Sequence, residues 1–259
     1  MRSRAHVRVI RKTPGEIEIM REAGRILARV LQEIVAAAQP GRATEELDKL
    51  ARARLAEAGA EPSFLGYRGY PAALCVEIED VVVHGIPGPE RLTAGTLLGM
   101  DVGAVYRGWQ ADMAVTIPLG AVDDTRRRLL EVTERALAAG IAQARAGKRL
   151  REVSAAVQQV AEEAGFSVVR DLVGHGIGRQ MHEPPQIPNF VSEGDFVEYD
   201  LVLRPGMTLA IEPMINAGRL AVRVDPDGWT VRTADGQPSA HFEHTVAVGR
   251  DGPQILTLP

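Results

Sequence analysis

The chain has 259 residues, of which 45% are hydrophobic and 25% are charged, and its formal net charge is −4. This composition is typical of a globular protein that buries a sizeable core, and it gives no reason to expect nucleic acid as a direct partner. The single cysteine excludes an internal disulfide framework and fits a reducing cytoplasm. The early arginines are not followed by the apolar core of a secretory signal, and no segment approaches the roughly 20 apolar residues of a membrane helix.

The sequence predicts a short basic arm over residues 1–12 and one domain over residues 13–259. Residues 13–16 predict a helix start, because a threonine cap, a proline in the first turn and a capping-box glutamate follow one another. Apolar residues then recur with the helical period over residues 17–34, before a Pro-Gly stop. A second helix is expected over residues 44–58.

Strand-like segments follow the two predicted helices, and the same order then recurs. Residues 74–76, 97–105 and 113–117 are expected to be strands separated by glycine and proline. Two further helices are expected, one from Asp123 or Asp124 to Gly147 and one from Arg151 to Gly165, followed by strands at 167–170, 196–202, 207–211, 218–224, 230–232 and 241–248. The chain is therefore expected to form two halves that share one core and meet at a cleft.

Four carboxylates and one histidine stand inside apolar, strand-like segments: Asp101, Asp112, His175, Glu212 and Glu243. Taken singly, each is more often a turn, loop or strand-end residue. Together they are harder to explain in that way, because charged groups are rarely buried without a partner or a metal. Such a ligand set suits Mn²⁺, Fe²⁺, Co²⁺ or Zn²⁺. Since four carboxylates exceed the need of one ion, two ions with bridging carboxylates would relieve their mutual repulsion.

Five short motifs, spread from residue 83 to residue 245, combine histidine, glutamate and proline. They are Val83-His84-Gly85-Ile86-Pro87, Gly174-His175-Gly176-Ile177-Gly178, Met181-His182-Glu183-Pro184-Pro185, Ile211-Glu212-Pro213-Met214 and Phe242-Glu243-His244-Thr245. In this combination the chain resembles type I methionine aminopeptidase over residues 13–248. The first and third motifs separate that family from proline-directed peptidases of the same fold. No long insertion lies between His175 and Glu212, which argues against type II, and the short N-terminus resembles the bacterial form.

The resemblance implies an α/β (α+β) fold of the pita-bread type, in which a curved antiparallel sheet is backed by helices and the halves are pseudo-twofold related. It implies a methionyl aminopeptidase that removes the initiator methionine from nascent proteins and prefers a small second residue. Two divalent ions (Co, Mn, Fe or Zn) are implied, with Asp112 and Glu243 bridging them. Asp101 would complete one ion site, and His175 and Glu212 the other. A cytoplasmic monomer is also implied.

The resemblance also assigns catalytic and substrate-binding residues. Glu212 is the expected general base, and His182 is expected to stabilise the tetrahedral oxyanion. His84 would hydrogen-bond the substrate backbone or help the leaving amine, although a histidine in this context is as often a core or turn residue. The pocket for the methionine side chain is expected to be lined by Phe64, Tyr67, Tyr70, Cys75, Met181 and Trp229. Taken alone, each of these pocket residues is also compatible with an ordinary core.

The chain departs from the family pattern at several positions. Phe64 stands where many relatives have Cys, and Met181 where some have an aromatic residue, so the shape of the pocket differs. Residues 77–80 replace the usual Ser-Val-Asn-Glu type of segment. In relatives an Asn of this segment helps to hold a monovalent cation. Glu79 stands at that position here, so the resemblance does not carry over the binding of that cation. His241 stands where the family usually has Gln, and we expect it to lie behind the metal ligands.

Two other functions stay open at this point. An Xaa-Pro aminopeptidase or prolidase-like peptidase of the same fold would keep all five ligands. A non-catalytic binding protein of this fold, acting with nucleic acid or the ribosome, would commonly lose metal ligands, and this chain keeps them. A ribosome contact through residues 1–12 is compatible with catalysis, but a solvated arm is the simpler expectation, also for His6.

Overall fold

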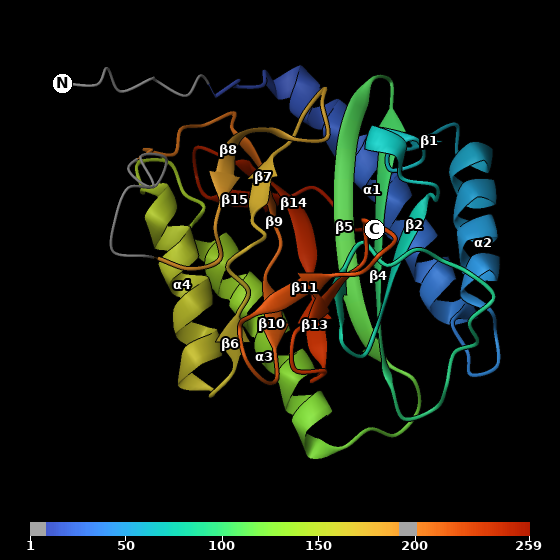
Figure 1. Ribbon diagram of the computed structural model, residues 1–259. Coiled ribbons are helices and arrows are strands. Elements are labelled where there is room, and N and C mark those ends of the chain that lie inside the picture. The colour runs from blue at the N-terminus through green and yellow to red at the C-terminus, as the bar shows by residue number, and fades with distance from the viewer. Residues whose placement is uncertain (1–8, 192–200) are drawn as a thin grey trace.

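Four helices lie behind a large antiparallel sheet, in two pairs (Figure 1). The structure is a computed structural model that describes residues 9–191 and 201–259. The first half of the chain contributes α1 (Pro14–Ala37) and α2 (Thr44–Glu57), and the second half contributes α3 (Asp124–Gln143) and α4 (Leu150–Glu163). This arrangement confirms the expected order of two helices followed by strands in each half. Among the described residues, no helix combines the length and the hydrophobicity needed to cross a membrane.

The starts of two helices follow from their capping residues. Thr13 Oγ1 accepts a hydrogen bond from the Glu16 backbone N–H at 3.3 Å, and the Glu16 carboxylate accepts one from the Thr13 N–H at 2.8 Å. Asp123 caps α3 by accepting from the Arg126 N–H at 2.8 Å. Each cap satisfies N–H groups that the first helical turn leaves without a partner. The two starts predicted from sequence are therefore confirmed.

The main sheet has nine strands, and its central path runs β1-β4-β5-β14-β9-β7-β8, with β2 added to β4 and β15 added to β14. Their bounds are β1 (Glu61–Pro62), β2 (Leu74–Ile78), β4 (Leu97–Tyr106), β5 (Trp109–Pro118), β7 (Gly174–Gly176), β8 (Glu183–Ile187), β9 (Thr208–Ile211), β14 (Glu243–Val248) and β15 (Pro253–Ile255). Every pairing described in this sheet is antiparallel. The antiparallel sheet backed by helices is as expected.

Two three-stranded sheets, ordered β13-β10-β6 and β11-β12-β3, complete the described strands. Their bounds are β3 (Val81–Val83), β6 (Ser167–Val168), β10 (Met214–Asn216), β11 (Val222–Val224), β12 (Val231–Thr233) and β13 (Ser239–His241). The strand expected over residues 241–248 is interrupted at Phe242, because β13 and β14 pair with different sheets. The strand expected over residues 196–202 lies mostly outside the described residues.

Each half buries an apolar cluster of its own, and further clusters contain residues of both halves, in agreement with the expected shared core. The first cluster packs α1 and α2 against β4 through residues such as Leu27, Leu47 and Met100. The second half buries a cluster that includes Leu137 and Ile211. Two smaller clusters join the halves, one through Met20 and Leu256 and one through Val83 and Met214.

The two halves meet where β5 runs beside β14, and we call this junction the seam. Only two residue pairs are in register there, Ala114 with Glu243 and Met113 with His244. On one side, Thr245 Oγ1 both accepts from the Asp112 N–H and donates to the Asp112 carbonyl oxygen, each at 2.9 Å. On the other side, Thr116 Oγ1 makes the same two bonds to the His241 backbone, at 2.9 and 2.8 Å. Two threonine hydroxyls thus replace direct backbone bonds and hold the strands apart.

The last residue of the predicted arm belongs to the folded body. The Lys12 N–H donates to the Gly206 carbonyl oxygen at 2.7 Å. Lys12 Nζ lies 2.6 Å from Glu183 Oε2, and the two side chains are only 2% and 5% exposed. Residue 12 therefore fastens the start of α1 to the segment that carries His182. The arm residues before position 9, with His6, lie outside the described residues.

Candidate metal centre

The register of the main sheet places the predicted ligands of the first half beside those of the second. Asp101 on β4 pairs with Ala114 on β5, and Ala114 pairs with Glu243 on β14. Residues that pair directly across an antiparallel sheet point to the same face. Asp101 and Glu243 therefore share a face, with only the methyl group of Ala114 between them. Asp112 is two residues before Ala114 and shares that face.

The remaining two ligands come from β7 and from the end of β9. His175 pairs with Ala210, and Glu212 directly follows β9. His175 Nε2 lies 3.5 Å from Glu212 Oε1 and 3.8 Å from Asp112 Oδ2. Two donors that bind one ion at roughly 2.0–2.2 Å are about 3–4 Å from each other. One donor atom each from Asp112, His175 and Glu243 also lie within 4.8 Å of one another. These separations fit ligands of a shared ion.

Burial makes this group of carboxylates costly without a cation. Burial, reinforced by neighbouring carboxylates, raises the pKa of Asp101, Glu212 and Glu243 well above the ordinary range, and burial raises that of Asp112 to about 7. Asp101 Oδ1 and Glu243 Oε1 are buried and have no hydrogen-bond partner in the described part of the chain. Burial also lowers the pKa of His175 to about 3, so its imidazole is neutral and can bind a metal. The donor set therefore fits divalent ions.

Metal-free protein should lose stability as the pH rises from about 6.5 to about 8. The raised pKa of Asp112, about 7, means that the native state holds a proton that the unfolded chain has already released. The native state is therefore favoured below that pKa and loses this advantage above it. The lowered pKa of His175 acts in the opposite direction, but only below its ordinary value of 6.5. Thermal unfolding in excess EDTA at the two pH values measures the change.

Added Mn²⁺ should reverse that pH trend, because metal binding displaces protons from the carboxyl groups and strengthens as the pH rises. The matched control is an Asp112→Asn variant in EDTA, which lacks one raised carboxyl and should show a shallower decline. A melting temperature that increases between pH 6.5 and 8 in the chelated wild type would contradict the assignment of these carboxyls as a proton-holding group.

One cavity of about 190 Å³ brings together every site residue predicted from sequence. The five predicted ligands lie on its wall with His84 and His182. Phe64, Tyr67, Tyr70, Cys75, Met181 and Trp229 also line it. Sequence reasoning missed five further lining residues: Arg68, Val83, Leu172, Val173 and Met214. Val83 and Met214 lie inside the quoted motifs, which could have signalled them, whereas no signal in the local sequence distinguishes the other three from loop or core residues. The cavity has a polar wall of ligands and an apolar wall of aromatic and sulfur-containing side chains.

Two histidines of the cavity are held in defined orientations. Tyr67 Oη lies 2.9 Å from His182 Nδ1, and the centroids of the His182 and His175 rings are 4.1 Å apart. His84 has a left-handed backbone with φ of 60°, a conformation that costs energy outside glycine and clusters at functional sites. Burial lowers the pKa of His84 to about 4 and also lowers that of His182. Both rings are therefore neutral near pH 7 and can donate one hydrogen bond each.

Three residues discussed from sequence lie outside the cavity wall. Glu79 accepts hydrogen bonds from Arg126 Nε at 3.0 Å and from the Leu97 N–H at 2.7 Å, so its charge is paired within the chain. His244 lies behind Glu243, with its Nδ1 2.8 Å from Thr257 Oγ1. His241 is also behind the ligands, as expected, and it contacts Glu77.

Comparison with known proteins gives the family. Residues 18–250 match metallopeptidase family M24. The chain belongs to metallopeptidase family M24. Methionine aminopeptidase 1 of Bacillus subtilis (strain 168) is 46% identical to this M24 chain over 249 residues, covering 96% of this chain and 99% of the relative. Methionine aminopeptidase of Escherichia coli (strain K12) is 42% identical, covering 95% and 93%. The resemblance inferred from the motifs is confirmed.

Solved structures agree on the fold. A crystal structure of methionine aminopeptidase from Thermotoga maritima superposes with a TM-score of 0.93 at 42% identity, and covers 97% of this M24 chain and 100% of its own. Prolidase from Pyrococcus furiosus superposes with a TM-score of 0.78 at 23% identity, covering 96% and 66%. At that identity the prolidase shows the fold alone. The predicted pita-bread fold is confirmed.

Proposed function

We propose that this M24 chain is a methionyl aminopeptidase that removes the initiator methionine from nascent proteins and peptides, with preference for a small second residue. The observation that carries the proposal is the cavity itself. Five metal-type ligands, four of them buried, form one of its walls, and a compact apolar pocket forms the other. A terminal amine and carbonyl can thus reach the ligands while an unbranched thioether side chain enters the pocket.

Two divalent ions would be held by the five ligands. Asp112 and Glu243 would bridge them, Asp101 would complete one ion site, and His175 and Glu212 the other. Such an ion pair supplies an activated water and polarises the scissile carbonyl. Glu212, which lines the cavity, would accept the proton of the attacking water. The choice among Co, Mn, Fe and Zn depends on availability as well as on the ligands.

His182 and His84 would act on the substrate. A Tyr67 hydroxyl that donates to His182 Nδ1 leaves the ring proton on Nε2, which is the tautomer that can donate to an oxyanion. His84 lies near the apolar wall, with its ring centroid 6.3 Å from that of Trp229. From there it would hydrogen-bond the substrate backbone or help the leaving amine.

The apolar wall would select methionine. Phe64, Met181 and Gly103 meet there, and a Cβ on Gly103 would lie 2.9 Å from Met181 Cε and 3.0 Å from Phe64 Cε1. Glycine at 103 therefore lets both larger side chains close the pocket. Burial raises the pKa of the Cys75 thiol, so Cys75 contributes a neutral apolar surface and is not a nucleophile.

Release of methionine from Met-Ala-Ser tests the proposal directly. The metal-replete protein should release methionine, EDTA should abolish the release, and Mn²⁺ or Co²⁺ should restore it. Two further substrates are assayed in parallel. An X-Pro dipeptide tests the prolidase-like alternative, and a tripeptide that begins with X-Pro tests the Xaa-Pro aminopeptidase alternative. Faster cleavage of either X-Pro substrate would refute the methionyl activity, and metal binding without cleavage of any peptide would favour the non-catalytic alternative.

We also propose that the enzyme acts in the cytoplasm as a monomer on the N-terminal peptides of new proteins. The absence of nucleic-acid signals in the acidic sequence supports a direct action on peptide alone. A ribosome contact through residues 1–12 would add to this activity without changing the site.

A further inference from the structure

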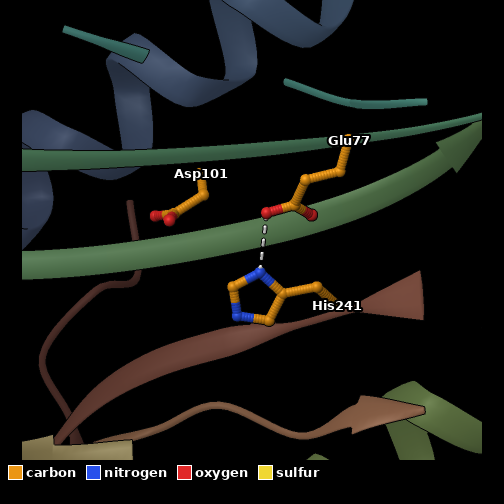
Figure 2. Close-up of side chains that lie close together, drawn as sticks. All are labelled: Glu77, Asp101 and His241. Atoms are coloured by element: carbon orange, nitrogen blue, oxygen red, sulfur yellow. Dashed lines mark hydrogen bonds and ion pairs between the residues drawn. The ribbon is translucent and has the colours of Figure 1, made fainter. Parts of the chain in front are cut away.

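Glu77 and His241 form a buried pair beside the cavity, and neither residue lines it. They are 3% and 1% exposed. His241 Nδ1 lies 3.0 Å from Glu77 Oε1, and Figure 2 shows the Glu77 carboxylate directed at the imidazole, with Asp101 close by. His241 Nε2 is buried and has no hydrogen-bond partner in the described part of the chain. A buried polar atom without a partner is costly and calls for an explanation.

The sheet register creates the space for this pair. Glu77 on β2 pairs with Gly99 on β4, and Gly99 pairs with Thr116 on β5. The Thr116 hydroxyl in turn binds the His241 backbone across the seam. A Cβ on Gly99 would overlap the Glu77 carboxylate and lie 2.7 Å from its Cβ. Because Gly99 has no side chain, Glu77 reaches over β4 and β5 to the histidine.

His241 occupies the place on the seam that corresponds to that of Asp112. Asp112 is two residues before Ala114, His241 is two residues before Glu243, and Ala114 pairs with Glu243. A threonine from the opposite strand binds both the N–H and the carbonyl oxygen of each. The seam thus presents a carboxylate on one side of Glu243 and an imidazole on the other.

The His241 ring also faces a ligand of the proposed metal centre. With Nδ1 occupied by Glu77, Nε2 is the atom that remains, and it lies 4.0 Å from Glu212 Oε2. The other Glu212 oxygen, Oε1, lies 3.5 Å from His175 Nε2. Glu212 therefore sits between two imidazoles, one for each carboxylate oxygen. A carboxylate that binds a metal through one oxygen is oriented by the hydrogen bond that its other oxygen accepts.

We propose that Glu77 and His241 are positioning residues for the metal centre: Glu77 fixes the His241 ring, and the ring holds Glu212 through Oε2 so that Oε1 faces the ion. This inference rests on the proposed role of Glu212 as a ligand. Glu77 and His241 touch neither substrate nor ion in this arrangement, and they act only through Glu212. To donate to Oε2, Nε2 must carry the ring proton, so Nδ1 accepts its hydrogen bond from a protonated Glu77 carboxyl, whose pKa burial raises. A movement of about 1 Å brings Nε2 from 4.0 Å to hydrogen-bond distance of Glu212.

Calorimetric titration of the metal-free protein with Mn²⁺ tests the inference without a peptide substrate. His241→Ala and Glu77→Leu should each weaken Mn²⁺ binding about 10–100-fold, whereas Glu77→Gln, whose amide can still donate to Nδ1, should not. The double variant should be no weaker than His241→Ala, because Glu77 acts through the ring. His241→Gln should keep Mn²⁺ affinity within about threefold of the wild type, since an amide can still donate to Glu212.

The matched control is His244→Ala. His244 is also next to Glu243, but its ring binds Thr257 instead of facing Glu212. Mn²⁺ affinity should stay unchanged in this variant. With Met-Ala-Ser at saturating Mn²⁺, His241→Ala should lower kcat while KM stays within about twofold, because the substrate cavity is intact. A folding defect alone would lower the active fraction without changing the metal affinity of the folded protein.

Unchanged Mn²⁺ affinity in His241→Ala, or losses that add in the double variant, would overturn the inference. X-ray absorption of Co²⁺-loaded protein gives a further check, because loss of one coordinated imidazole in His241→Ala would make His241 a direct ligand instead of a positioning residue. A wild type that binds no metal would refute the proposed function. If the wild type binds Mn²⁺ and cleaves Met-Ala-Ser, and the His241→Ala variant has the same Mn²⁺ affinity and kcat, the positioning role alone is refuted.

Discussion

Replacing Asp112 with asparagine should lower methionine release from Met-Ala-Ser by about 10³-fold, the upper range for loss of one electrostatic group in an active site. Asp112 is 5% exposed and lies 3.8 Å from His175 Nε2, where the proposed bridge joins the two ions. Asparagine keeps the shape and the oxygen that accepts from the Met113 N–H at 3.1 Å, so the backbone should stay in place. The charge and one donor oxygen are lost, and with them the bridge.

Asp48→Asn is the matched control for this change. Asp48 is a buried carboxylate of α2 that accepts hydrogen bonds from the Ala73 and Leu74 N–H groups, away from the cavity. Its variant should melt at a lower temperature but bind Mn²⁺ as the wild type does. Assays at several Mn²⁺ concentrations separate weak binding from slow chemistry. Activity of Asp112→Asn within tenfold of the wild type at saturating Mn²⁺ would refute the bridging role.

Replacing Lys12 with alanine should destabilise the protein by about 3–5 kcal/mol, as expected when one partner of a buried ion pair is removed. The variant leaves the Glu183 carboxylate buried, with the Gln180 N–H at 3.2 Å as its remaining partner among the contacts described. Chemical denaturation at pH 7 and constant Mn²⁺ measures the loss. Because Glu183 follows His182 directly, kcat for Met-Ala-Ser should also fall.

Two further variants make the Lys12 result specific. Lys49→Ala removes an exposed pair with Glu45, whose side chains are 68% and 48% exposed, and should cost less than about 1 kcal/mol. The double variant Lys12→Met with Glu183→Gln removes both charges and should recover most of the stability. If Lys12→Ala unfolds at the same denaturant concentration as Lys49→Ala, then Lys12 does not fasten the arm to the body.

The helices and the longest strands could be predicted because their signals are local. The cap at Thr13 and the apolar periodicity of α1 depend on neighbouring residues, and the long β4–β5 hairpin has continuous strand-forming sequence. The strands β7 and β8 were not predicted, because the first contains two glycines in three residues and the second two prolines. Tertiary pairing overrides weak local propensity at both places.

Within the candidate site, the sequence indicated which residues could bind metal, but not how the residues around them are arranged. The five proposed ligands could be named because carboxylates in apolar segments are unusual and because their motifs resemble a known family. The contact between Glu77 and His241 joins residues 164 positions apart. It depends on the register of β2, β4 and β5, on the missing side chain of Gly99 and on the Thr116 hydroxyl. No local pattern encodes that combination, so it could only be found in three dimensions.

The brevity of the seam gives the cations a mechanical role. Asp101 and Asp112 come from the first half of the chain, whereas His175, Glu212 and Glu243 come from the second. Each bound ion would therefore be a crosslink between the two halves at the seam, where the main sheet has only two pairs in register. Metal binding would therefore stiffen the seam at the same time as it supplies the reactivity.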